Sequence, residues 1–190
     1  MVTAPPQVRA AHLKTLLATL ADGSPRDPTE GEDPLPSEVR DRIESAHRLS
    51  WLPAEDLVEV CRAAERRVGP GGLEAWGAAA LKRMLQAPLF GAFYEAAMWL
   101  ERRDPGVLIH YGVQAWPLLY SGCGDLLVEA RGKGEVRLLH LPVPDLLRCE
   151  TTLLPLLGGI AALTREAGCD VRVEADWSPN GERFVYTVRW

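Results

Sequence analysis

The spacing of apolar residues divides the chain into a helical first part and an alternating second part. In the first part, apolar residues recur every three or four positions, which is the period of one face of an α-helix. After about residue 124 the period falls to two, which is typical of half-buried β-strands. The clearest helical stripe consists of Leu73, Trp76, Ala80, Leu81 and Met84.

Proline and glycine bound the predicted helices. Pro53 and Pro105 suit the first turn of a helix, where a missing backbone N–H costs nothing. The run Gly69-Pro70-Gly71-Gly72 ends one helix before the next begins. The helices predicted in this part span residues 37–49, 53–68, 73–84, 89–101 and 105–120.

The second part predicts four strands and one helix. Residues 125–131 and 135–141 flank Gly132-Lys133-Gly134, which is a hairpin signal. A helix follows over residues 153–167, and two strands then cover residues 171–177 and 183–190. The last two strands alternate, so Arg172, Glu174 and Asp176 are expected to face water. The order of elements predicts an α+β fold, with N-terminal helices followed by a ββαββ unit that forms an antiparallel sheet packed against helices.

Residues 1–36 differ in character from the rest. Residues 6–21 read as a short amphipathic helix, and residues 22–36 are rich in proline, glycine and acidic side chains. A stretch of that composition buries little apolar surface and is typical of a linker. We therefore expect residues 1–36 to form an arm plus linker, and residues 37–190 to form a single α+β domain.

Charge and composition exclude several classes of protein. The net charge of -5 argues against a nucleic-acid partner, since such proteins usually carry a basic excess. No apolar run reaches the roughly 18–20 residues of a membrane span, and the first residues do not resemble a signal peptide. The expected location is the cytoplasm, where Cys61, Cys123, Cys149 and Cys169 are expected to be free thiols.

Residues with catalytic potential are sparse. Cys123 lies between two glycines, which favours exposure of a thiol, but a nucleophilic cysteine needs a base and none lies nearby in the sequence. A pocket near Cys123 and His140 is the enzyme alternative. The four histidines and four cysteines show no zinc spacing, although Cys123, His140 and Cys149 are able to converge in space. No metal and no cofactor are predicted.

Aromatic residues on the predicted helices suggest a ligand pocket. Trp76, Phe93, Trp99 and Trp116, together with His110, fall on helices of the first part. Aromatic stripes at helical spacing usually fill a core. The alternative is that these five residues line a pocket for a small apolar ligand.

Several short motifs resemble a paralogous domain family of unknown function that is abundant in myxobacteria. The resemblance covers about residues 51–190. More distantly, the layout is similar to haem–nitric-oxide-binding domains, 4-vinyl-reductase-type ligand domains and TRAPP-type trafficking subunits. The motifs that carry the family resemblance are Trp51-x-Pro53, Gly71-Gly72, Asp104-Pro105, Gly158-Gly159, Val171-x-Val173 and Tyr186-x-Val188-x-Trp190.

The resemblance implies haem sensing, and the sequence argues against it. In haem–nitric-oxide-binding domains the proximal histidine lies on the helix before a proline-containing connection. The corresponding segment, residues 93–101, holds no histidine, and the tyrosine–serine–arginine signature for the haem propionates is missing. Axial ligation is what fixes haem in a protein, so a colourless protein is expected.

The function expected from the sequence is therefore binding. The chain would act as a non-enzymatic binding or regulatory interaction domain, through a protein partner or homodimer or through an apolar ligand pocket. The alternatives are a haem-free small-molecule sensor and an enzyme with its pocket near Cys123 and His140.

Overall fold

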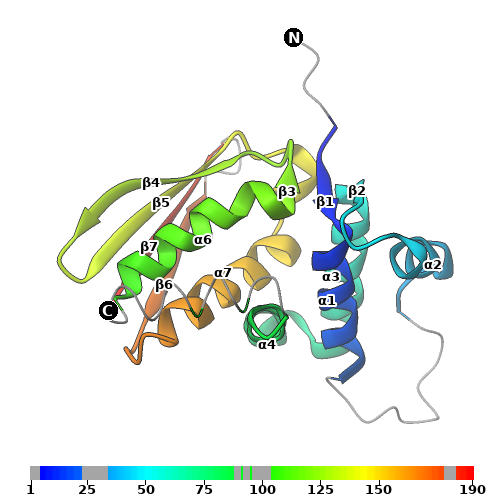
Figure 1. The fold of residues 1–190 in the computed structure, drawn as a ribbon, viewed down its shortest axis with the longest axis horizontal. Coiled ribbons are helices and arrows are strands. Elements are labelled where there is room, and N and C mark those ends of the chain that lie inside the picture. Colours follow the sequence, from blue (N-terminus) through cyan, green and yellow to red (C-terminus); the bar gives the residue numbers. More distant parts are fainter. Residues whose placement is uncertain (1–4, 23–33, 88–90, 92–94, 96–103, 178–182) are drawn as a thin grey trace.

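A computed structural model of the chain describes residues 5–22, 34–87, 91, 95, 104–177 and 183–190. It places a helical layer on one face of an antiparallel sheet, with a second group of helices beside that layer (Figure 1). This is the α+β class that the order of elements predicts. The helices are α1 (Ala10–Asp22), α2 (Ser37–Ser45), α3 (Ala54–Val68), α4 (Leu73–Leu85), α6 (Pro105–Leu119) and α7 (Glu150–Arg165).

The main sheet has four antiparallel strands in the order β4-β5-β7-β6. The helices α6 and α7 cover one of its faces (Figure 1). Along β7, Phe184, Tyr186 and Val188 are buried while the residues between them are more exposed, which confirms the period-two pattern. The strands are β4 (Asp125–Gly132), β5 (Glu135–Leu141), β6 (Arg172–Trp177) and β7 (Phe184–Arg189).

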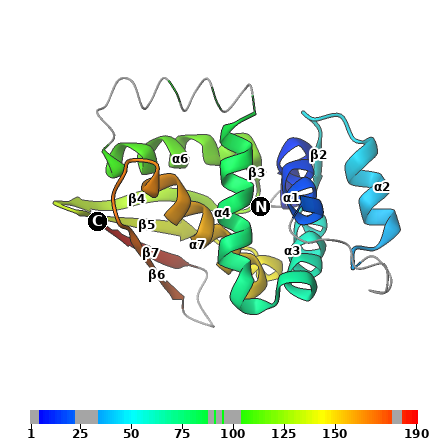
Figure 2. The ribbon, with the colours of Figure 1, turned by 90° about the horizontal axis from the view of Figure 1, so that it is seen from below.

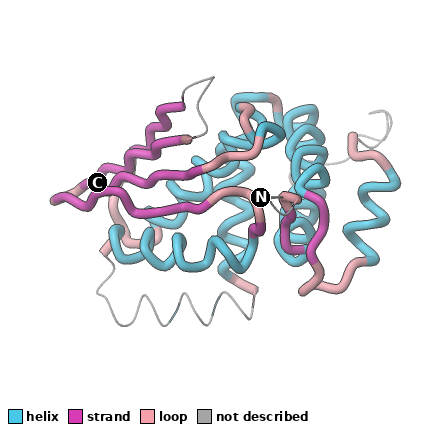
Figure 3. The backbone as a smooth tube through the Cα atoms, turned by 90° about the horizontal axis from the view of Figure 1, so that it is seen from above, coloured by secondary structure: helices cyan, strands magenta, loops and turns pink. Residues whose placement is uncertain are grey.

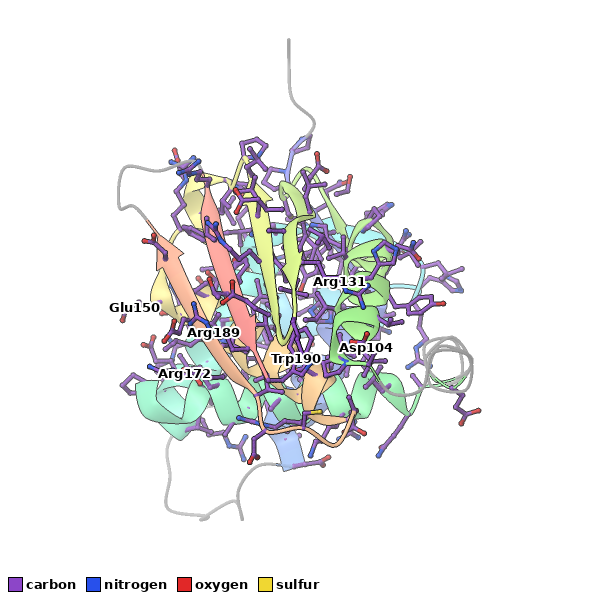
Figure 4. All side chains as sticks on the ribbon, turned by 90° about the vertical axis from the view of Figure 1, so that its left-hand side faces the viewer. Asp104, Arg131, Glu150, Arg172, Arg189 and Trp190 are labelled. Atoms are coloured by element: carbon purple, nitrogen blue, oxygen red, sulfur yellow. The ribbon has the colours of Figure 1, made fainter. Side chains whose placement is uncertain are left out.

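The outer face of this sheet is charged. Arg189 of β7 lies 2.7 Å from Glu135 of β5 and 2.7 Å from Glu174 of β6, and Arg172 reaches Glu174 at 2.9 Å. Figure 4 looks onto these strands, with Arg172, Arg189 and Trp190 labelled. Arg172, Glu174 and Asp176 are exposed, as the alternation predicts. Cross-strand ion pairs of this kind keep one face in water while the other packs on the helices.

A smaller sheet ties the N-terminal residues to two distant segments. Its strands, β1 (Gln7–Arg9), β2 (Trp51–Pro53) and β3 (Tyr120–Ser121), form antiparallel pairs in the order β2-β1-β3. Figure 3 shows this sheet apart from the four-stranded one. None of the three was predicted, because two or three residues show no period.

The N-terminal helix is part of the core, which corrects the expectation of a separate arm. The side chain of Leu13 is fully buried, and those of Leu16, Leu17 and Leu20 are at least 94% buried. They belong to one cluster with residues of α3, α4 and the main sheet. The amphipathic pattern was therefore correct, but the surface that the helix covers belongs to the same chain. Most of the predicted linker, residues 23–33, lies outside the described residues.

The helices α4 and α7 make the most extensive contact between helices in the described part of the chain. A Cβ atom added to Gly158 of α7 would overlap the backbone of Glu74, and one added to Gly77 of α4 would overlap the backbone of Pro155. The two backbones therefore touch, which only glycine allows at such positions. Figure 2 shows α4 between the layer of α6 and α7 and the pair of α1 and α3.

Most predicted elements lie where the sequence places them, with small differences at their ends. The helix predicted from residue 153 begins at Glu150, so Thr152 lies inside its first turn, where its hydroxyl bonds to the Leu147 and Cys149 carbonyls. The helix predicted over 89–101 lies largely outside the described residues. Across the part of the chain that is described, no helix is both long and apolar enough to cross a lipid bilayer.

Candidate functional site

A cavity of about 190 Å³ lies where α1, α3, α4, α6 and α7 meet the sheet. The part of its wall that the structure describes is mostly aliphatic and aromatic. The described lining residues are His12, Leu16, Leu57, Cys61, Gly77, Ala80, Leu81, Met84, Leu85, Leu108, Ile109, Tyr111, Gly112, Val113, Ala115, Trp116, Leu119, Tyr120, Leu126, Leu138, Thr152, Pro155, Leu156, Gly159, Ile160 and Leu163.

The cavity exists because small residues stand where helices converge. Gly77 brings α4 against α7, which sets the separation of the two walls. Gly159, one position beyond the contact at Gly158, meets no described atom within 4 Å of an added Cβ. Small residues at these points leave apolar space that larger side chains would otherwise fill.

Two of the lining residues, His12 and Tyr120, form a hydrogen-bonded pair. The hydroxyl of Tyr120 lies 2.8 Å from Nε2 of His12, and the two rings meet edge to face with centroids 5.4 Å apart. The other ring nitrogen of His12, Nδ1, is buried and has no hydrogen-bond partner among the described residues. Such an unpaired nitrogen is uncommon in a protein interior.

Burial keeps the ionisable groups of the wall neutral. Desolvation lowers the pKa of His12 to about 4, so the imidazole is uncharged at neutral pH. Desolvation also raises the pKa of the Tyr120 hydroxyl and of the Cys61 thiol far above their usual ranges, so both keep their protons. The cavity therefore offers hydrogen bonding without charge.

Trp116 fixes the position of Tyr120. The two rings are stacked, with centroids 4.0 Å apart and planes 24° apart. The indole N–H of Trp116 donates to the carbonyl of Gly124 at 2.8 Å, and its ring meets that of His140 edge to face at 5.0 Å. The tyrosine ring is thus held on one side by a residue that is itself anchored to the backbone.

The structure separates the five residues predicted for the pocket. Trp116 lines the cavity. Trp76 is buried but is not among the described lining residues, and His110 is exposed on α6, where its Nε2 bonds to the side chain of Gln114. Phe93 and Trp99 lie outside the described residues.

The hydrogen-bonded pair of the cavity, His12 and Tyr120, was not predicted. They stand 108 positions apart in the sequence. The available signal was a histidine set in the leucine stripe of the first helix.

Cys123 and His140 are neighbours, but their geometry does not suit catalysis. Nε2 of His140 lies 2.8 Å from the carbonyl oxygen of Cys123, and Nδ1 lies 3.2 Å from the hydroxyl of Tyr186. The thiol of Cys123 is buried and donates to the carbonyls of Gln7 and Ser121. Burial raises the pKa of this thiol to about 11, so it stays protonated at neutral pH, whereas the thiolate is the nucleophile.

Histidines and cysteines do not gather elsewhere in the described residues either. In that part of the chain, no three histidine, cysteine, aspartate or glutamate side chains stand close enough to hold a metal ion. All four cysteines are free; Cys61 and Cys123 are buried, and Cys149 and Cys169 are partly buried.

Comparison with known proteins finds likeness in structure and none in sequence. No family model and no curated protein matches the chain. A crystal structure of an Fe(II) unliganded H-NOX protein from K. algicida matches with a TM-score of 0.62 at 10% identity, over 95% of each chain. An oxygen-binding H-NOX domain related to soluble guanylate cyclases matches with a TM-score of 0.61 at 13% identity, over 95% of this chain and 93% of that one.

This likeness shows a shared fold and no more. It agrees with the distant resemblance to haem–nitric-oxide-binding domains that the order of elements suggested. The resemblance to a myxobacterial family has no support from these comparisons.

Proposed function

We propose that this chain is a non-enzymatic ligand-binding domain that takes a small apolar molecule into the cavity between α1, α3, α4, α6 and α7. The observation that carries this proposal is the cavity itself, which has a volume of about 190 Å³ and an almost wholly apolar wall. An engineered apolar cavity of roughly 150 Å³ stays dry and binds benzene or xenon. A space of this size and lining therefore suits a molecule with about one ring.

The fold supports a sensing role. The most similar structures include a domain described as oxygen binding and related to soluble guanylate cyclases. A cavity walled by several helices is a suitable place for such a role, because a ligand there alters the packing of each helix that it touches.

The described residues of this cavity do not fit haem. Haem is a ring of four pyrroles with two carboxylates, and this cavity suits about one ring. Its described wall holds no lysine or arginine to pair with carboxylates. The thiol of Cys61 stays protonated, whereas a cysteine ligates haem iron as its thiolate.

Titration with benzene, followed by amide chemical shifts in the full chain, tests the proposal. We expect saturable shifts of residues on α4, α6 and α7. Gly159→Leu places a side chain where an added Cβ meets no described atom, and it should abolish these shifts. The matched control is Gly71→Leu, which also meets no described atom within 4 Å but lies on the exposed 3-10 turn Pro70–Gly72, away from the cavity.

If the folded wild-type protein shows no saturable shifts, the proposed function is wrong. Equal loss in both glycine variants would contradict binding in this cavity. A haemin titration of the same sample gives a separate test of the haem argument, since a stoichiometric Soret band would overturn it.

Docking to a protein partner or to a second copy is the second candidate. Large apolar side chains are exposed in the described structure, with Leu49 61% and Leu118 54% accessible. The guanidinium of Arg9 bonds to the carbonyls of both residues, so their backbones lie close together. Measurement of native mass tests the homodimer, and a monomeric mass at high concentration would argue against it.

A further inference from the structure

We propose that Tyr120 is the hydrogen-bond donor of the cavity, and that the ligand is a small apolar molecule carrying one acceptor oxygen, such as a cyclic ketone. This inference rests on the proposed function and names the chemistry of its ligand. It follows from the pairing of His12 with Tyr120 and from the unpaired nitrogen of His12.

The unpaired nitrogen decides which proton His12 carries. A neutral imidazole has one N–H donor and one acceptor nitrogen, and the low pKa of His12 makes the ring neutral at physiological pH. Among buried backbone groups, orphaned N–H donors are rarer than under-satisfied acceptors, and we apply the same preference to the two imidazole nitrogens. Nδ1 has no described partner, so the proton belongs on Nε2.

The position of that proton frees the hydroxyl of Tyr120. If Nε2 carries the proton, it donates to the phenolic oxygen across 2.8 Å. The hydrogen of the phenol is then free to bond to a ligand, since His12 is the hydrogen-bond partner described for this hydroxyl and His12 is itself the donor. Burial raises the pKa of Tyr120, so the hydroxyl remains protonated and able to donate.

The surroundings of Tyr120 match the shape of such a ligand. Tyr120 lines a cavity whose other described lining residues are mostly apolar, so its hydroxyl is one of few polar groups beside a largely hydrocarbon surface. Trp116 is stacked on Tyr120, and its indole N–H donates to the carbonyl of Gly124. The indole N–H therefore does not bond to the tyrosine hydroxyl. An uncharged ligand with one oxygen accepts the hydrogen bond of the Tyr120 hydroxyl. It brings no further polar group that would lack a partner in the cavity.

Two probes of the same shape test this inference in the full chain. Cyclohexanone and methylenecyclohexane differ in one group, C=O against C=CH2. We expect Tyr120→Phe to weaken the ketone about fivefold more than the hydrocarbon, which corresponds to the loss of one neutral hydrogen bond. In the wild-type protein, the carbonyl stretch of bound cyclohexanone should fall, and histidine nitrogen shifts should place the His12 proton on Nε2.

The outcomes separate the two proposals. If neither probe binds to the wild-type protein, the proposed function fails. If both bind but Tyr120→Phe weakens them equally, or the carbonyl stretch stays at its value in hydrocarbon solvent, the cavity binds ligands and the donor role of Tyr120 is wrong. The two wild-type measurements decide the matter even if Tyr120→Phe does not fold.

Discussion

Gly158 of α7 lies against the backbone of Glu74 of α4 so closely that an added Cβ would come within 2.8 Å of the Glu74 Cα and would overlap its carbonyl. Both contact partners are main-chain atoms, so neither is able to turn away as a flexible side chain does. We expect Gly158→Ala to force the two helices apart and to lower the free energy of unfolding by about 3 kcal/mol or more.

The neighbouring glycine provides the control. An added Cβ at Gly159 meets no described atom within 4 Å. Gly159→Ala should therefore raise the free energy of unfolding by up to about 1 kcal/mol through helix propensity. Denaturant unfolding of both variants measures the difference, and similar values for the two would contradict the backbone contact.

The ion pair between α2 and α3 should respond unequally to the loss of its partners. Arg42 bonds to both carboxylate oxygens of Asp56, at 2.9 and 2.6 Å, and the side chain of Asp56 is 1% exposed whereas that of Arg42 is 46% exposed. Arg42→Ala leaves a buried carboxylate unpaired and should cost about 3 kcal/mol. Asp56→Ala leaves the guanidinium of Arg42 without its partner, but this exposed side chain can be solvated by water. The loss of stability should therefore be smaller, about 1–2 kcal/mol.

A thermodynamic cycle checks that prediction. The double variant Arg42→Ala, Asp56→Ala should be no less stable than Arg42→Ala alone, because the second change removes the stranded charge. Strictly additive losses would show that the pair is not coupled.

Stability should fall in mild acid because of His12. The pKa of its imidazole is about 4 in the folded chain and about 6.5 in an unfolded one, so between these values the unfolded state binds more protons. The free energy of unfolding therefore rises with pH through this window. The contribution of His12 to this rise is about 3 kcal/mol, and it is complete above pH 6.5. Burial also lowers the pKa of His140, which adds to the slope in the same direction.

Unfolding curves from pH 4 to 7 measure this slope. His12→Gln should flatten it, whereas His110→Gln changes an exposed ring on α6 and serves as the surface control. A slope that is the same in wild type and His12→Gln would contradict the burial of the His12 ring in the native state.

Removal of residues 1–22 should destroy the fold. The sequence predicts that residues 1–36 are an arm plus linker outside the α+β domain, so that their loss would leave the domain folded. The structure reverses it, because Leu13, Leu16, Leu17 and Leu20 are buried in the common core. Each such leucine contributes roughly 1.5–3 kcal/mol, and their sum is comparable with the whole stability of a domain. Circular dichroism and a thermal melt of the shortened chain give the answer, and a cooperative melt near that of the full chain would contradict it.

The sequence predicted the main sheet well because its signal is local. The alternation in residues 135–141 and the glycine hairpin before it gave the boundaries of β5 without error. For the same reason the charges at Arg172 and Glu174 were correctly expected to face water. Trp190 follows the alternation less closely than the buried residues of β7. It packs against the core but is only half-buried.

The parts that the sequence did not predict depend on distant residues. The strands β1, β2 and β3 have two or three residues each and are strands only because they pair with one another. The helix α1 looked like an arm because the composition of residues 22–36 suggested separation, and nothing in its own pattern identifies the surface that it covers. Trp116 was correctly placed on a helix, but its role depends on Tyr120 and Gly124, which fold against it.

The small sheet also has a consequence for how the chain reaches its native state. The strand β1 is paired on one side with β3, and Tyr120 of β3 bonds to His12, which lies 108 positions away in the sequence. Contacts so distant in sequence require the closure of a long loop. The chain loses conformational entropy when the loop closes, before the contact can stabilise the structure, and folding is therefore slower. On the ribosome, the first helix emerges well before β3 has been made. We therefore expect its leucine face to stay unprotected until α4 has been made, and the cavity to close only after the chain has passed α7.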